Sequence, residues 1–82
     1  MTTLPAPRPL RVIAHEILSL WPNPYFGAEP YLSAMFHLDK ITDNYFEDSA
    51  ESVVNYFLAN ANTWRGDRAR EIKAELNGML KR

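Results

Sequence analysis

The sequence predicts a small all-α domain, a four-helix bundle-like arrangement preceded by a mobile Pro-rich N-terminal arm. Two stripes in the second half of the chain carry this prediction, because their apolar residues recur every three or four positions. Asp48 and Ser49 precede the first stripe as candidate N-caps, and Glu51 stands three residues after Asp48, the spacing of a capping box. The two stripes consist of Ala50, Val53, Val54, Phe57, Leu58 and Ala61, and then of Ala69, Ile72, Leu76, Met79 and Leu80.

The predicted elements begin with an arm over residues 1–8, where alternating prolines favour an extended chain. The remainder, residues 9–82, is expected to form one helical domain. Pro9 suits the first turn of a helix, where its missing N–H is not needed. This helix is expected to end near residue 21, because Pro22 and Pro24 follow it.

A second helix is predicted from Pro30 to about Ile41, with Glu29 favourable beside the positive end of its dipole. Apolar side chains cover most of its circumference, so we expect it to be central or to face a partner as well as the core. Part of the surface formed by five of its residues is expected to meet a second chain, and these are Tyr31, Leu32, Met35, Phe36 and Leu38.

The rest of the chain is expected to contain a polar connection and two more helices. The connection covers residues 42–47 and carries Tyr45 and Phe46. The third helix is predicted over about residues 49–61. The fourth is predicted to begin near Thr63 or Asp67 and to end near residue 80, with Gly66 as a cap or a flexible first turn.

The composition argues against several kinds of site. The chain has no cysteine, which excludes disulfides and thiolate zinc sites, and its two histidines are too few for a metal cluster. The acidic run from Asp39 fails as a calcium loop, because Ile41 and Asn44 stand where an oxygen ligand and a glycine are required. No serine carries a nucleophile signature. We therefore expect no enzyme activity, no cofactor and no metal.

The first apolar run does not resemble a signal peptide, because His15 and Glu16 interrupt it early. No run approaches the length of about 18 apolar residues that a membrane span requires. The sequence therefore predicts a cytoplasmic protein with no membrane partner.

The net charge of −1 conceals an uneven distribution of charge. Residues 29–62 contain six acidic residues and one lysine, whereas residues 63–82 contain six basic and three acidic residues. Such a dipole can steer partners, or the two regions can simply attract each other within the fold. Arg70, Lys73 and Lys81 are expected to line one exposed flank of the last helix, where a basic stripe could follow phosphates. An acidic stripe beside it favours an ordinary solvated helix.

Aromatic residues in the predicted loops are candidates for binding a partner. Most loop aromatics fold back over the core, but those exposed together make anchors of the kind that interfaces use. Arg65 and Arg68 lie near the apolar side of the last helix and are candidates for ion pairs with the acidic middle segment or for a partner contact. The partner-binding candidates are Tyr25, Phe26, Tyr31, Phe36, Tyr45, Phe46, Tyr56, Arg65 and Arg68.

Several segments carry a family resemblance. They are Tyr56-Phe57-Leu58-Ala59-Asn60-Ala61, Thr63-Trp64-Arg65-Gly66, Ala69-Arg70 and Lys73-Ala74-Glu75-Leu76, with Pro30-Tyr31-Leu32 and Met35 upstream. Over about residues 25–80 the chain resembles small proteins of unassigned function from actinobacteria and their phages and plasmids. The resemblance implies a cytoplasmic protein of mobile-element origin and assigns no catalytic residue.

These features favour a protein–protein interaction module, such as a phage or mobile-element accessory protein that binds and modulates a host protein. Self-association into a homodimer is a further expectation, and a purely structural small oligomer is another reading. The main alternative is a nucleic-acid-binding helical regulator whose basic last helix lies near phosphates. A nucleic-acid mimic that uses the acids between Glu29 and Glu51 is the third alternative.

Overall fold

The computed structural model describes residues 8–81, and for Lys81 the backbone alone. The predicted arm therefore lies outside the described residues except for Arg8. The described chain is mostly helical, as the periodicity predicts, and contains one antiparallel ribbon of two short strands that was not expected. The elements in order are α1 (Leu10–Leu20), α2 (Glu29–Met35), β1 (Asn44–Tyr45), β2 (Asp48–Ser49), α3 (Ala50–Ala59) and α4 (Asp67–Lys81).

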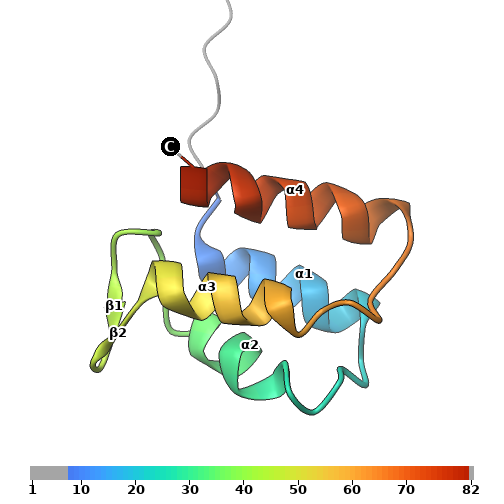
Figure 1. Cartoon of the computed structure of the whole chain (residues 1–82), viewed down its shortest axis with the longest axis horizontal. Coiled ribbons are helices and arrows are strands. Elements are labelled where there is room, and N and C mark those ends of the chain that lie inside the picture. The colour runs from blue at the N-terminus through green and yellow to red at the C-terminus, as the bar shows by residue number, and fades with distance from the viewer. Residues whose placement is uncertain (1–7, 82) are drawn as a thin grey trace, which may run out of the picture.

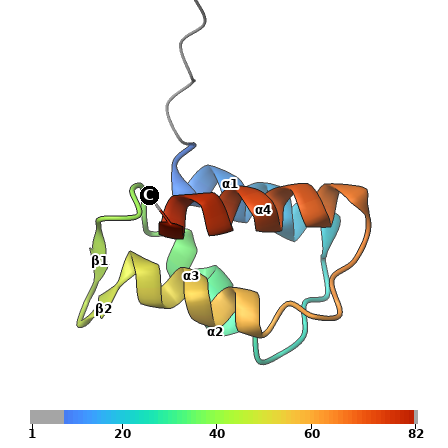
Figure 2. The same ribbon diagram turned by 45° about the horizontal axis from the view of Figure 1, so that its top comes forward.

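The four helices pack in pairs around one core. α2 packs against both α1 and α3, and α4 lies across α1 and α3 on the other side (Figure 1). The ribbon extends from one end of α3, beyond the body of the helices, in both views (Figure 2). The connections 21–28 and 60–66 lie at the opposite end of α3. The ribbon and these connections are therefore separated by the length of α3.

The core forms from the two predicted stripes and from the inner faces of α1 and α2. Phe57 and Ile72 are fully buried, and two tryptophan rings contact the Phe57 ring. The Trp21 and Trp64 rings are stacked with their centroids 5.8 Å apart, and the Phe57 ring lies edge-on to each at 6.5 Å. Both predicted stripes are thus confirmed as core, with Leu58 and Leu80 partly buried at their margins.

The second helix is shorter than the sequence predicts, because it ends at Met35 instead of near Ile41. Short-range turns close it, and Leu38 then folds back into the core. The carbonyl oxygens of Leu38 and Asp39 accept hydrogen bonds from the backbone N–H groups of Arg11 and Leu10, both at 2.8 Å. These bonds satisfy N–H groups at the start of α1 that would otherwise lack partners, and Pro9 supplies no side-chain cap there.

Most of the apolar side chains predicted for the second helix are buried or partly buried in the chain's own core. Leu32, Met35 and Leu38 are buried, and Tyr31 and Phe36 are partly buried against the same core. Self-association through this helix stays a prediction. Less apolar surface of the helix is exposed for such a contact than the sequence pattern suggests.

The N-cap of α3 is Ser49, and the predicted capping box from Asp48 to Glu51 is wrong. Asp48 belongs to β2, and the Ser49 hydroxyl accepts a hydrogen bond from the Ser52 backbone N–H at 3.1 Å. α4 begins at Asp67, the later of the two expected starts. Gly66 precedes it with a φ of 120°, a conformation that favours glycine, and its carbonyl accepts from the Arg70 N–H at 3.0 Å.

Candidate functional site

The partner-binding candidates are divided among separate places on the surface. Tyr45 and Phe46 lie at the end of the ribbon, whereas Tyr25, Phe26, Tyr31 and Tyr56 lie around the opposite end of the α2–α3 pair. Phe36 lines a hollow between α1 and α2, and the two arginines belong to the start of α4 and the connection before it. The predicted residues therefore do not form one site.

The end of the ribbon, which we call the ribbon tip, consists of Tyr45, Phe46, Glu47 and Asp48. Tyr45 pairs with Asp48 across the ribbon, so Phe46 and Glu47 form a two-residue loop. Phe46 has a relative exposure of 88%, the highest of the exposed large apolar residues in the described chain. Its ring centroid is 4.7 Å from the Tyr45 ring in an edge contact, and Tyr45 in turn stacks on His37 at 5.8 Å.

The backbone at Phe46 is strained. Phe46 has a φ of 56°, the only positive φ of a non-glycine residue in the described chain. A positive φ at the first of two loop residues is the pattern of a type II′ hairpin turn, in which glycine is the usual occupant. For a bulky side chain this conformation costs on the order of 1–2 kcal/mol. The sequence therefore places phenylalanine where glycine would fold more easily.

The ribbon tip lies in a segment without positive charge. No lysine or arginine occurs from residue 41 to residue 64, whereas Asp43, Glu47, Asp48 and Glu51 occur there. The Asp43 carboxylate accepts backbone hydrogen bonds from Lys40 and Asp39, which hold its pKa below the usual range. Glu47 and Asp48 are exposed at the tip itself. The tip therefore combines an exposed aromatic ring with exposed acidic side chains.

Two further aromatic pairs, Tyr25 with Phe26 and Tyr31 with Tyr56, are together called the aromatic face. Tyr31 of α2 stacks on Tyr56 of α3 with centroids 5.3 Å apart, so this pair ties the two helices together. Tyr25 and Phe26 contact each other at 4.8 Å. A Cβ at Gly27 would lie 2.6 Å from the Tyr25 ring and 2.8 Å from Asn60 Oδ1, so a larger residue there would require one or both side chains to shift.

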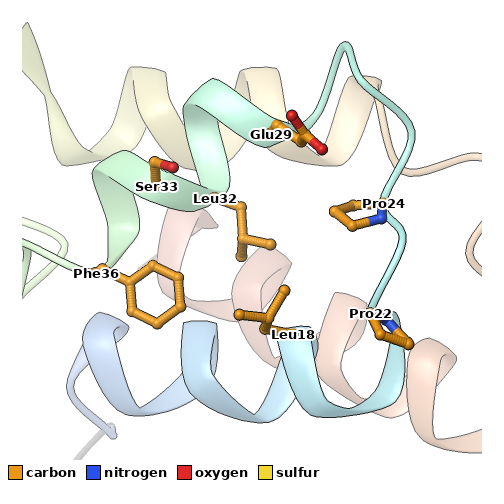
Figure 3. Close-up of a pocket in the computed structure, with 7 residues that line it drawn as sticks. All are labelled: Leu18, Pro22, Pro24, Glu29, Leu32, Ser33 and Phe36. Carbon is orange, nitrogen blue, oxygen red and sulfur yellow. The ribbon is translucent and has the colours of Figure 1, made fainter.

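A shallow hollow of about 210 Å³ lies between α1 and α2. Leu18, Leu32 and Phe36 point into it from the two helices, and Pro22 and Pro24 border it (Figure 3). The His15 ring makes an edge contact with Phe36 at 4.7 Å. Glu29 is the one ionisable residue among those that line the hollow, so nothing in the lining pairs an acid with a base.

Arg68 belongs to an ion-pair network, but its partners differ from the prediction. It pairs with Glu16 of α1 at 2.6 Å and with Glu71 of its own helix at 3.0 Å, not with the acidic middle segment. Arg8 donates to Glu16 Oε1, which also accepts from Arg68, and it pairs with Glu75 as well. Hydrogen bonds from Arg68 and Arg8 lower the pKa of Glu16 to about 2. Arg68 therefore joins α1 to α4, whereas Arg65 is exposed.

Lys73 is not part of an exposed basic flank, and that prediction is wrong. Its ammonium donates to the carbonyl oxygens of Ala61 at 2.8 Å and Trp64 at 2.6 Å, and it lies 5.8 Å from the centre of the Trp64 ring. Burial, and then the nearby charge of Arg65, lower the pKa of Lys73. Lys73 thus closes the connection between α3 and α4, and Arg70 pairs with Asp67.

No family model, curated protein or solved structure matches the chain. Among the described helices, none is both long and apolar enough to cross a membrane. Within the same residues, no three or more histidine, aspartate or glutamate side chains are grouped so that they could hold a metal ion.

Proposed function

We propose that the protein is a protein–protein interaction module and that Phe46 is its principal anchor. The observation that carries the proposal is the placement of Phe46, which is 88% exposed and has a φ of 56°. Folding gains little from a ring that leaves so much of its surface in water. Folding also loses free energy to the backbone strain. An exposed aromatic ring held on a short hairpin is the kind of residue that fills a pocket on a partner.

The helices supply a scaffold for this anchor. The Ser49 cap connects β2 directly to α3, and the Ala50 N–H donates to the Asp43 carbonyl at 2.8 Å, which fixes the base of the ribbon. The His37, Tyr45 and Phe46 rings form a row that limits how the tip can turn. We propose that the helices act as a rigid four-helix bundle-like body, because an anchor that is already ordered loses less entropy on binding.

The basic residues of α4 give less support to the nucleic-acid alternative. Arg68, Arg70 and Lys73 all have partners within the chain, and the acids Glu71 and Asp67 lie among them. Phosphate binding draws its affinity from cations that are free to replace counterions. An accessory protein of a phage or plasmid that modulates a cytoplasmic host protein would fit an interaction module of this size, and this role is part of the proposal.

The proposed function is tested by capture from nuclease-treated lysate of the source organism. The parent chain, Phe46→Gly and Phe26→Ser are immobilised in parallel, and the retained proteins are identified. We expect a protein that the parent and Phe26→Ser retain and that Phe46→Gly loses. Phe26 is a matched control, because it is a second exposed phenylalanine on the aromatic face.

Two results would contradict the proposal. Capture that survives Phe46→Gly and is lost with Phe26→Ser would place the contact on the aromatic face. A salt-sensitive association with nucleic acid before nuclease treatment, without any retained protein afterwards, would favour the nucleic-acid alternative.

A further inference from the structure

We infer that the partner of the ribbon tip is a protein segment with an apolar residue or socket for Phe46 that is surrounded by lysine and arginine. This inference rests on the proposed function and adds the chemistry of the partner. Its two observations are the exposed ring of Phe46 and the charge of the chain around it.

The negative charge at the tip is not neutralised from nearby in the sequence. Glu47 stands in the loop beside Phe46, Asp48 follows it, and residues 41–64 contain no basic residue. The ion pairs of the described residues involve Arg8, Arg11, Arg68 and Arg70, and none of them includes Glu47 or Asp48. Four arginines are thus engaged elsewhere, whereas Lys40 lies at the base of the ribbon beside Asp43 and not at its tip.

This charge selects among partners. A surface of the same sign would be repelled as it approached the tip, and so would nucleic acid. A basic surface would be attracted, and its association rate would rise at low salt. The Phe46 ring supplies affinity once the surfaces meet, because burial of an aromatic side chain in a pocket dominates binding at interfaces of this kind. The ring and the acids therefore have separate tasks, which different variants can separate.

A displayed library of random linear peptides tests the inference without a known partner. Peptides are selected on the immobilised parent chain, and those that Phe46→Gly also retains are discarded. We expect the surviving peptides to combine an aromatic or aliphatic residue with flanking lysines and arginines. The affinity of one such peptide is then measured for three proteins, which are the parent, the tip variant Glu47→Gln/Asp48→Asn and the control variant Glu29→Gln/Asp67→Asn.

The control variant changes the net charge by the same amount as the tip variant, at two exposed acids outside the ribbon. At low salt the tip variant should bind about tenfold more weakly than the parent, chiefly through slower association. The control variant should stay within about twofold. The tip effect should nearly disappear at about 1 M salt, where the screening length is near 3 Å.

Three other outcomes overturn the inference in distinguishable ways. Peptides that depend on Phe46 but are neutral or acidic would contradict the charge of the partner and leave the proposed function in place. Equal losses of peptide affinity in the tip and control variants would show that the net charge of the protein governs binding, and not the acids at the tip. A selection that yields no Phe46-dependent peptide would contradict the anchor and, with it, the proposed function.

Discussion

The variant Phe57→Ala is expected to lose about 3–5 kcal/mol of unfolding free energy. The Phe57 ring has no exposed surface and lies edge-on to both tryptophans at 6.5 Å, so its removal would leave a cavity where α3 meets the core. Small domains have only about 5–15 kcal/mol of stability in total. We therefore expect the variant to unfold at a much lower denaturant concentration than the parent.

Tyr56 provides the control, because it is the preceding residue and its exposure is 55%. Tyr56→Ala removes the stacking on Tyr31 at 5.3 Å and should lower the unfolding free energy by about 1 kcal/mol. Denaturant titration followed by far-ultraviolet circular dichroism measures both variants without relying on the tryptophans. Losses of equal size would contradict the orientation of α3.

The second large effect is expected at Lys73. Lys73→Met keeps most of the side-chain volume and removes the hydrogen bonds to the Ala61 and Trp64 carbonyls. Leaving such acceptors without a partner costs about 1–3 kcal/mol. We expect an unfolding free energy that is lower by about 2 kcal/mol, measured in the same titration.

Arg70→Met is the matched control, because it removes the same charge from an exposed position on the same helix. Its ion pair with Asp67 is a surface pair and contributes at most about 1 kcal/mol. A loss at Arg70 as large as that at Lys73 would show that the charge of α4 matters and not the two carbonyl bonds. Tests of nucleic-acid binding should accordingly alter Arg65 and Arg70 and leave Lys73 intact.

The helices could be predicted from the sequence where local signals agree. α3 and α4 have apolar residues at helical spacing, and the residues named as their stripes are buried or partly buried. α1 begins after Pro9 and ends before Pro22, as proline chemistry requires. These features depend on neighbours within one or two turns, and a single sequence contains that information.

The errors arise where distant contacts override local preference. The apolar pattern of α2 continues to Ile41, but α2 ends early. The carbonyls of Leu38 and Asp39 instead accept hydrogen bonds from the first residues of α1. Lys73 lies at a solvent-facing position of a helical wheel. Its ammonium nevertheless donates to carbonyl oxygens 12 and 9 residues earlier in the chain, in the connection before α4. No periodicity indicates such contacts.

The candidate site could be predicted only residue by residue. Tyr45 and Phe46 stand out as aromatics in a polar connection, but the ribbon that presents them follows no turn rule, because the loop has phenylalanine where glycine is usual. The stacking of Tyr31 on Tyr56 depends on how α2 packs against α3. The departure from the turn rule at Phe46 becomes visible only when the structure shows the ribbon and the φ of this residue.

The central claim is that the Phe46 ring serves a partner and not the fold, and one denaturant titration of the parent, Phe46→Gly and Phe46→Ala tests it. Both variants lose the ring contact with Tyr45, but only glycine relieves the strain of a φ of 56°. We predict that Phe46→Gly stays within about 0.5 kcal/mol of the parent or exceeds it, and that it is about 1 kcal/mol more stable than Phe46→Ala. A loss of about 2 kcal/mol or more in Phe46→Gly would contradict the account, because it would show that the ring supports the fold.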